Sequence, residues 1–306
     1  RRLPRAGRPM TAAGGAIYDR GYRPYDGPRG GRGAATAALY RASMRRALGL
    51  RRSWRQKVAP FVLLGIVTIP AVVNVGVAYL TRNQFGDRVE IITYRDYVGV
   101  SSALLVFVAL TAPDIVCPDR RQRVLPLLFA RPLTGADYVL AKVGALATIL
   151  FAFSFLPQVL LFVGQALVSD GTLAYVRDNA DVTWKVATSC AVLAVFFAVV
   201  GVAVASLASR RIVGGAGFIG LFLVSSIVSG ILVGGETAQA EGSMAALLNV
   251  LTLPLYLRDL IFLGRLDPAS PLSGVDGGGP AAMFAYLAVV AVGLTVLYRR
   301  YRWTER

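Results

Sequence analysis

The chain has 306 residues, of which 55% are hydrophobic and only 16% are charged, and its mean hydropathy is +0.57. Soluble domains carry charges on about a quarter of their residues, so this composition excludes an ordinary soluble protein. The apolar residues come in runs of about 20 or more, and a helix of that length crosses a hydrocarbon layer about 30 Å thick. We therefore expect an all-α, polytopic integral membrane protein.

The distribution of charge predicts how the chain is oriented in a membrane. The net charge is +16, which by itself would suit a nucleic-acid binder, but 26 of the 33 Lys and Arg residues lie in segments on one side of the expected spans and 7 on the other. The acidic residues show the opposite bias, with 6 on the first side and 11 on the second. This is the positive-inside asymmetry of a multi-pass protein. It predicts that both termini are cytoplasmic and argues against nucleic acid as a partner.

Several kinds of chemistry lack the residues they need. The chain has no His, which is the commonest general base and metal ligand, and its two cysteines, Cys117 and Cys190, lie where a mutual disulfide is not expected. It carries no G-x-x-x-x-G-K-[ST] phosphate loop and no pair of mid-membrane carboxylates of the kind that proton-coupled carriers use. We expect no catalytic residue, no metal and no cofactor in this chain. Three functions stay open: a permease driven by a separate ATPase, a non-catalytic membrane scaffold, and a lipid-processing membrane enzyme.

The N-terminal region precedes the first span and divides into two parts. Residues 1–33 are rich in Gly, Pro and Arg and are expected to form a flexible basic cytoplasmic tail. Residues 34–57 have helical periodicity, with apolar side chains on one side and arginines beside them, so they predict an amphipathic interfacial helix. We expect its apolar side to lie among lipid headgroups and its arginines to meet anionic lipid. The two sets are Tyr40, Met44, Ala47 and Leu48, and Arg41, Arg45 and Arg52.

Residues 58–306 are expected to form a transmembrane domain of six spans. Two polar side chains within the spans, Asn74 and Gln158, are candidate pathway-lining residues, because such groups must face protein or water; hydrogen bonding between helices is the alternative. Pro113 and Asp114 are expected to end the second span near the cytoplasmic surface. The expected spans are Val58–Leu80, Tyr97–Val116, Tyr138–Phe162, Trp184–Leu207, Ile212–Val233 and Ala281–Tyr298.

Small residues cluster where the fourth span meets the fifth. Gly201, Ala205 and Ser209 recur at intervals of four, a spacing that lets two helices approach closely. The start of the fifth span holds four glycines in seven residues, which indicates either a packing face or a hinge. These are Gly214, Gly215, Gly217 and Gly220.

Residues 247–263 form an apolar stretch whose topology is ambiguous. The stretch contains Pro254 and the adjacent charges of Arg258 and Asp259. Placing both charges in a span would cost roughly 5 to 6 kcal/mol before any gain from pairing, and a seventh span would put the C-terminus outside. We therefore expect a segment that dips into the outer leaflet and returns, or lies on it.

The loop between the second and third spans is the most distinctive segment. Its sequence from Asp119 to Lys142 is basic and amphipathic, DRRQRVLPLLFARPLTGADYVLAK. Residues 124–130 are apolar, and Pro126 and Pro132 limit how far a helix extends, so we expect a short helix across the membrane surface. The alternative is an ordinary positive-inside loop with a solvated run of charge.

The residues Arg131, Pro132, Leu133 and Lys142 in this loop resemble the cytoplasmic loop of permease subunits of type 2, exporter-like ABC transporters. The resemblance implies an N-terminal elbow helix, a cytoplasmic coupling helix, external re-entrant helices before the last span, and the bacterial plasma membrane. It also implies ABC ATPase subunits and a second permease copy or related permease subunit as partners, and the export direction follows from it alone. Gly135 departs from the pattern, because many relatives carry a basic residue there. The residues that the resemblance places against the ATPase are Asp119, Arg120, Arg121, Arg123, Leu127, Leu128, Arg131 and Pro132.

Overall fold

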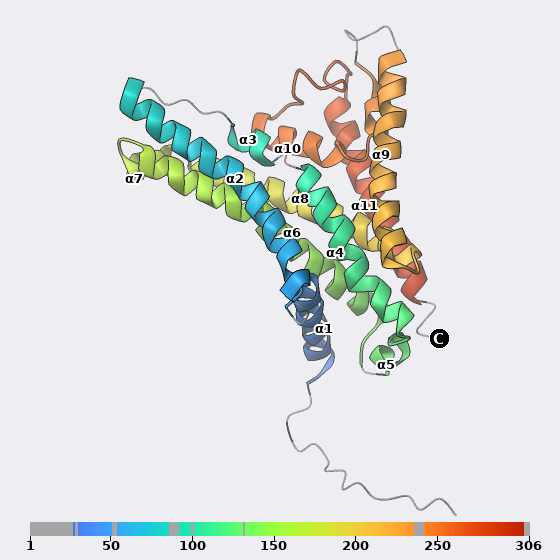
Figure 1. Ribbon diagram of the computed structural model, residues 1–306. Coiled ribbons are helices and arrows are strands. Elements are labelled where there is room, and N and C mark those ends of the chain that lie inside the picture. Colours follow the sequence, from blue (N-terminus) through green and yellow to red (C-terminus); the bar gives the residue numbers. More distant parts are fainter. Residues whose placement is uncertain are drawn as a thin grey trace, which may run out of the picture. The chain divides into compact units, whose positions relative to one another are not determined.

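The computed structural model describes residues 27, 30–50, 54–85, 92–98, 101–130, 132–235 and 242–302. Two units are distinguished, residues 1–30 and Gly31–Arg306, and the account below concerns the second. Most of the predicted N-terminal tail, and the loop residue Arg131, lie outside the described residues. Every regular element in the described part of the second unit is a helix (Figure 1).

Within the described residues, six helices are long and apolar enough to cross a membrane, as the sequence predicted. The second of these candidate spans, Tyr94–Arg121, joins two helices, α3 and α4. The long helices are α2 (Trp54–Phe85), α4 (Ser101–Arg121), α6 (Gly135–Val168), α8 (Ala180–Leu207), α9 (Arg211–Gly235) and α11 (Gly278–Arg302). The short elements are α1 (Arg32–Ala47), α3 (Tyr94–Val98), α5 (Leu125–Phe129), α7 (Thr172–Asp178), the 3-10 helix η1 (Met244–Leu248) and α10 (Leu253–Leu263).

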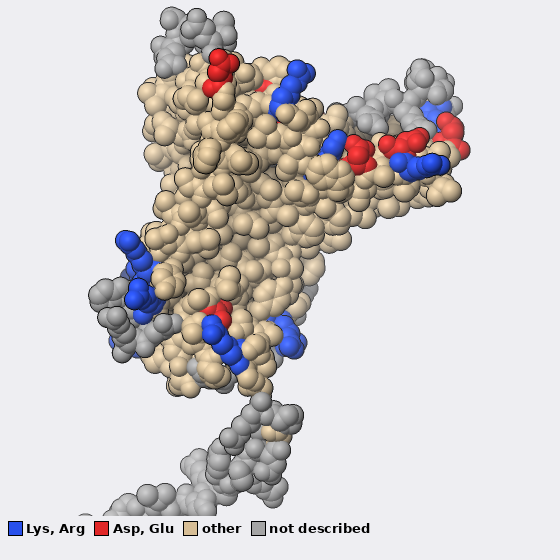
Figure 2. All heavy atoms as spheres, turned by 180° about the vertical axis from the view of Figure 1, so that it is seen from behind, with Lys and Arg blue, Asp and Glu red and all other residues tan. Residues whose placement is uncertain are grey.

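Helix α8 lies at the centre of the packing. It contacts α4, α6, α9, α10 and α11, and its buried rings Phe196 and Phe197 pack against Tyr286 of α11 and Phe222 of α9. Helices α2 and α9 instead expose most of their large apolar side chains, as expected for helices that face lipid. Figure 2 shows charged side chains gathered toward two ends of the visible face, with an uncharged band between them. The end that carries α1 and α5 is called the α5 end below, and the end that carries α3 and α10 the α10 end.

The apolar side of α1 is covered by protein. We expected this side to lie among lipid headgroups, but α1 packs against α6 and α4, and Leu39, Ser43 and Ala47 are buried. The hydroxyl of Tyr40 donates a hydrogen bond to Oγ1 of Thr148 on α6 at 2.9 Å. The exposed arginines of α1 agree with the predicted polar side, and the packed side makes α1 part of the helical body.

Helix α4 continues through Pro113, which was expected to end the second span, and through a second proline, Pro118. Pro113 and Pro118 both lie inside α4, which reaches Arg121. A proline leaves the carbonyl four residues earlier without its helical donor, and neighbouring helices can stabilise such a break in a membrane. Here that carbonyl belongs to Ala109, and α9 approaches it so closely that a Cβ added to Gly215 would lie 2.6 Å from its oxygen. The prediction was wrong because tertiary packing compensates for the proline.

The glycines of α8 and α9 form packing faces. A Cβ added to Gly201 would lie 2.4 Å from Val108 of α4, and one added to Gly214 would lie 3.2 Å from Pro113. Gly220, in contrast, has nothing within 4 Å of such an atom. The packing-face interpretation is thus confirmed for the glycines that face α4.

Helix α10 is too short to span a membrane. Its 11 residues rise about 16 Å, roughly half of a hydrocarbon layer. It ends at Gly264, whose φ of 69° is in the left-handed region that glycine adopts readily. The structure therefore agrees with the prediction that residues 247–263 do not form a seventh span.

Candidate functional site

The loop after α4 forms the short helix that its sequence predicted. Helix α5 (Leu125–Phe129) carries Pro126 in its first turn, and Arg123, with a φ of 52°, reverses the chain between α4 and α5. Leu125 is buried and Leu128 packs partly against the core. Leu127 points the other way and is 70% exposed. The helix therefore has one apolar side held by the protein and one apolar residue presented outward.

The base of this loop is fixed by the buried carboxylate of Asp119, near the end of α4. Its Oδ1 accepts a charged hydrogen bond from Nη1 of Arg46 on α1 at 2.6 Å. Its Oδ2 lies 2.6 Å from Nζ of Lys142 and accepts a hydrogen bond from the hydroxyl of Tyr138 at 3.0 Å, both on α6. One carboxylate thus joins α1, α4 and α6 at the α5 end.

Lys142 is the most deeply buried charged member of this cluster. It is 2% exposed, and its Nζ also donates to the backbone oxygen of Ile115 on α4 at 3.0 Å. The same nitrogen lies 5.2 Å from the centroid of the Tyr138 ring, which in turn packs at 4.7 Å against Tyr301 of α11. A buried ammonium is tolerated only when it is paired and hydrogen-bonded, and this one is both. Through Tyr301 the cluster reaches a fourth helix.

A second contact joins α1 to the start of α6. Thr134 and Asp137 form a reciprocal capping box, in which each side chain bonds to the backbone N–H of the other. Nε of Arg32 lies 2.7 Å from Asp137, and its Nη2 donates to Oγ1 of Thr134 at 3.1 Å. The T-x-x-D spacing is a recognisable N-terminal helix signature, so this cap could have been found from sequence. Gly135, the departure from the family pattern, is buried in the first turn that this cap begins.

The predicted coupling residues divide into two groups. Asp119 is buried in the cluster, and Nη1 of Arg120 donates to the backbone oxygens of Ser206 and Ala208 at the end of α8, at 2.8 and 3.2 Å. The second group faces outward: Arg121, Arg123, Leu127 and Pro132 are exposed, and Leu128 is half-buried. Other contributors to the site were not predicted as site residues, and they are Arg32, Arg46, Thr134, Asp137, Tyr138, Lys142 and Tyr301.

The two candidate pathway-lining residues hold one segment near the α10 end. Nδ2 of Asn74 donates to the backbone oxygen of Ile92 at 2.8 Å, and Nε2 of Gln158 donates to that of Tyr94 at 3.1 Å. Both side chains are buried. Gln158 also borders an apolar cavity of about 150 Å³, which Tyr94 and Phe162 line as well. Gln158 therefore connects α6 to α3, and Asn74 connects α2 to the segment just before α3.

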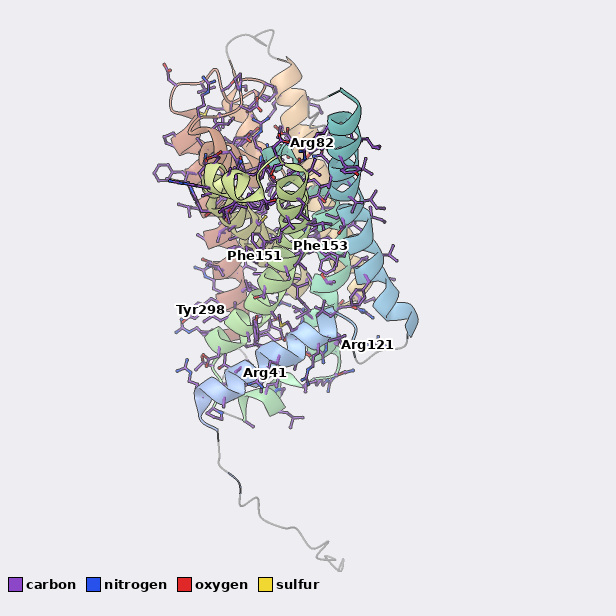
Figure 3. All side chains as sticks on the ribbon, turned by 90° about the vertical axis from the view of Figure 1, so that its left-hand side faces the viewer. Arg41, Arg82, Arg121, Phe151, Phe153 and Tyr298 are labelled. Carbon is purple, nitrogen blue, oxygen red and sulfur yellow. The ribbon has the colours of Figure 1, made fainter. Side chains whose placement is uncertain are left out.

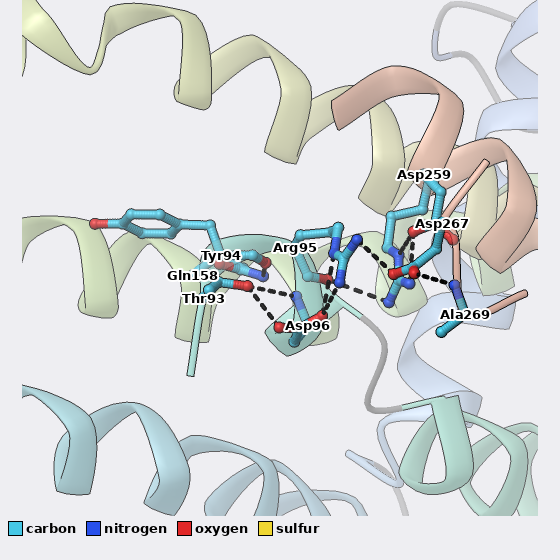
Figure 4. A network of polar contacts seen from close by, with 9 residues as sticks. Thr93, Tyr94, Arg95, Asp96, Gln158, Asp259, Asp267 and Ala269 are labelled. Carbon is cyan, nitrogen blue, oxygen red and sulfur yellow. Dashed lines mark hydrogen bonds and ion pairs between the residues drawn. The ribbon is translucent and has the colours of Figure 1, made fainter. Parts of the chain in front are cut away.

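A polar network ties α3 to α10 and the segment after it (Figure 4). Arg95 of α3 forms an ion pair with Asp267 at 2.7 Å, and its backbone oxygen accepts a hydrogen bond from Nη1 of Arg258 at 3.3 Å. Arg258 also pairs with the neighbouring Asp259 at 2.7 Å. Burial raises the pKa of Asp259, against the opposing effect of Arg258. The backbone N–H of Ala269 and the guanidinium of Arg95 lower the pKa of Asp267.

No protein-family model matches the chain, and no curated protein matches it at significant similarity. Two features of the α5 end therefore indicate a function: the outward apolar residue of α5 and the buried cluster around Asp119.

Proposed function

We propose that this chain is the membrane-spanning permease subunit of an ATP-driven ABC transporter of the type 2, exporter-like class. ATP binds and is hydrolysed in separate ATPase subunits, and a second permease copy or a related subunit completes the translocation pathway. The protein lies in the bacterial plasma membrane with both termini and α5 in the cytoplasm. The observation that carries the proposal is a short helix that presents an exposed leucine while its base is fixed to four other helices.

The outward side of α5 has the composition of a small interface. Leu127 is 70% exposed, and the exposed arginines at 121 and 123 precede it closely in the chain. Interfaces concentrate binding energy in a central apolar anchor, and charged residues at the rim mainly speed association and set its salt dependence. A groove on an ATPase subunit that covers Leu127 and presents acidic groups to these arginines would suit this surface.

The buried cluster connects α5 rigidly to the ends of α1, α4 and α6. Separating Asp119 from Lys142 would leave a buried charge without its partner, which typically costs 3 to 5 kcal/mol. The ends of α1, α4 and α6 therefore resist moving apart when α5 is pushed. Leu125 and Leu128 pack against the same body, so a displacement of α5 becomes a tilt of the attached spans.

The α10 end completes the proposed arrangement on the opposite side of the membrane. Helix α10 takes the place of an external re-entrant helix before the last span. Its two charges form a pair with each other, which lowers the cost of lying at the level of the outer leaflet. The network from Arg95 to Asp267 holds this helix against α3.

Leu127→Asp tests the proposal. The tagged chain, purified from its native membranes, is expected to retain a subunit that carries a G-x-x-x-x-G-K-[ST] loop and vanadate-sensitive ATPase activity. Removing an interface anchor costs about 2 kcal/mol or more, so Leu127→Asp should reduce both the retained subunit and the ATPase activity at least 10-fold. Single replacement of Leu127 is preferable to replacing Leu128, which packs inward.

Leu173→Asp is the matched control. Leu173 lies on α7 and is 83% exposed. Helix α7 connects α6 to α8 at the ends that lie away from α5, so the same substitution there should leave the complex intact. If the Leu127→Asp protein keeps its ATPase subunit and full activity, α5 is a solvated loop and the coupling role is wrong. A chain that co-purifies with no ATPase from membranes in which it is functional would favour the scaffold function.

A further inference from the structure

A large cavity lies at the α5 end, apart from the outward side of α5. It has a volume of about 1140 Å³ and lies between the end of α4 and the turn from α8 into α9. In Figure 3, Arg41 and Arg121 lie toward this end of the molecule, and Arg82 lies toward the opposite end. The cavity lining combines guanidinium groups with apolar side chains, namely Arg121, Arg210 and Arg211 with Cys117, Pro118 and Ile212.

Polar contacts hold the walls of this cavity in place. Arg120 of α4 donates to the backbone oxygens of Ser206 and Ala208, which fixes the end of α8 against α4. Arg211, the first residue of α9, forms an ion pair with Asp114 of α4. Both elements that face α4 across the cavity are thus attached to it by charged hydrogen bonds, so the cavity belongs to the folded helical body.

The arginines of the cavity differ in how far their charge is compensated. Arg211 has its carboxylate partner, Asp114. Arg121 and Arg210 are exposed, and neither forms an ion pair with another residue in the described part of the chain. Guanidinium groups bind phosphate through two parallel hydrogen bonds, and they are less strongly hydrated than ammonium groups. Two such groups bordering one cavity favour a phosphate-bearing ligand.

The apolar side chains at the cavity indicate which kind of phosphate-bearing ligand fits it. Ile212 is 86% exposed, and Leu207 and Val213 beside the same turn are 60% and 55% exposed. They continue into the apolar outward face of α9. A soluble phosphate would leave these side chains uncovered, whereas the glycerol and acyl chains of a phospholipid would cover them. The volume exceeds the roughly 300 to 1000 Å³ of typical ligand pockets, so it accommodates a headgroup together with its glycerol.

We propose that this cavity binds the headgroup of an anionic phospholipid, with Arg121 and Arg210 on the phosphate and the acyl chains along Ile212 and α9. Basic pockets at the ends of transmembrane helices are suited to such headgroups. The proposal does not depend on transport or on an ATPase subunit, because the site consists of this chain and lipid alone. It would place a bound lipid next to the end of α4 that leads into α5.

The test compares two double variants by native mass spectrometry of the detergent-solubilised protein. Phosphatidylglycerol is titrated against phosphatidylcholine, and wild type is expected to bind phosphatidylglycerol preferentially. R121Q/R210Q should weaken that binding at least 10-fold. R41Q/R45Q removes two exposed arginines of α1 at the same end and should change it less than 3-fold. Equal losses in the two variants would mean a general charge effect and would overturn the site.

Two further measurements separate the remaining alternatives. A photoactivatable phosphatidylglycerol should attach to wild type within residues 117–122 or 207–213, and labelling only elsewhere would contradict the proposal even if the variants fold poorly. Glycerol 3-phosphate should fail to displace the lipid; displacement at comparable concentration would make the ligand a soluble phosphate. If R121Q/R210Q keeps its lipid binding but loses the ATPase subunit, the cavity is a protein contact and the lipid proposal is wrong.

Discussion

Replacing Lys142 by Met tests whether the buried cluster holds the α5 end together. Met fills a similar volume but has no charge, so Asp119 keeps only Arg46 and Tyr138 as partners. Breaking a buried ion pair by removing one partner typically costs 3 to 5 kcal/mol, because the other charge stays buried. Since Arg46 is partly exposed and still present, we expect a loss near the lower limit, about 3 kcal/mol.

The two native cysteines make this loss measurable. Both Cys117 and Cys190 are buried and free, so a thiol-activated fluorescent dye reports unfolding of the detergent-solubilised protein during heating. The unfolding entropy is about 2.1 cal/mol/K per residue, so for a chain of 306 residues 1 kcal/mol shifts the Tm by about 1.6 °C. A loss of about 3 kcal/mol should therefore lower the Tm by about 5 °C.

Lys185→Met is the matched control, because it also breaks a Lys–Asp pair on a long helix. Lys185 lies 2.8 Å from Asp181, but the carboxylate is 55% exposed and the pair spans one helical turn. Exposed pairs of this kind contribute about 0.3 to 0.5 kcal/mol, so the Tm should change by less than about 2 °C. Adding Asp119→Asn to Lys142→Met removes the buried carboxylate charge that has lost Lys142, and it should recover part of the lost Tm. If Lys142→Met unfolds within 2 °C of wild type, the cluster does not stiffen the base of α5.

Two further predictions use positions that the structure distinguishes. Gly215→Ala places a Cβ 2.6 Å from the backbone oxygen of Ala109 and should cost about 1 to 3 kcal/mol of stability in the same thermal assay. Gly220→Ala meets open space and should leave the Tm unchanged. Equal Tm values for the two variants would contradict the close packing of α4 and α9. In intact cells, a membrane-impermeant maleimide should label Leu173→Cys directly and Leu127→Cys only after permeabilisation, and external labelling of Leu127→Cys would reverse the proposed orientation.

The number and type of the long helices follow from the sequence alone. Span length depends on a continuous apolar run, which is a local property that hydropathy measures directly. The short α5 was also predictable, because prolines at 126 and 132 restrict the backbone whatever surrounds it. The same holds for α10, where adjacent opposite charges at 258 and 259 argue against a span on energetic grounds.

Tertiary structure alone decided which polar groups meet. Asp119 lies beside a run of basic residues, yet it pairs with Arg46, 73 positions earlier, and with Lys142 on α6. Nothing local distinguishes Arg46 from its neighbours on α1, because an ion pair depends on distance in space and on burial. The helical course through Pro113 is of the same kind. A local rule ends the helix there, and it fails because α9, a hundred residues later, packs a glycine against the carbonyl that the proline leaves free.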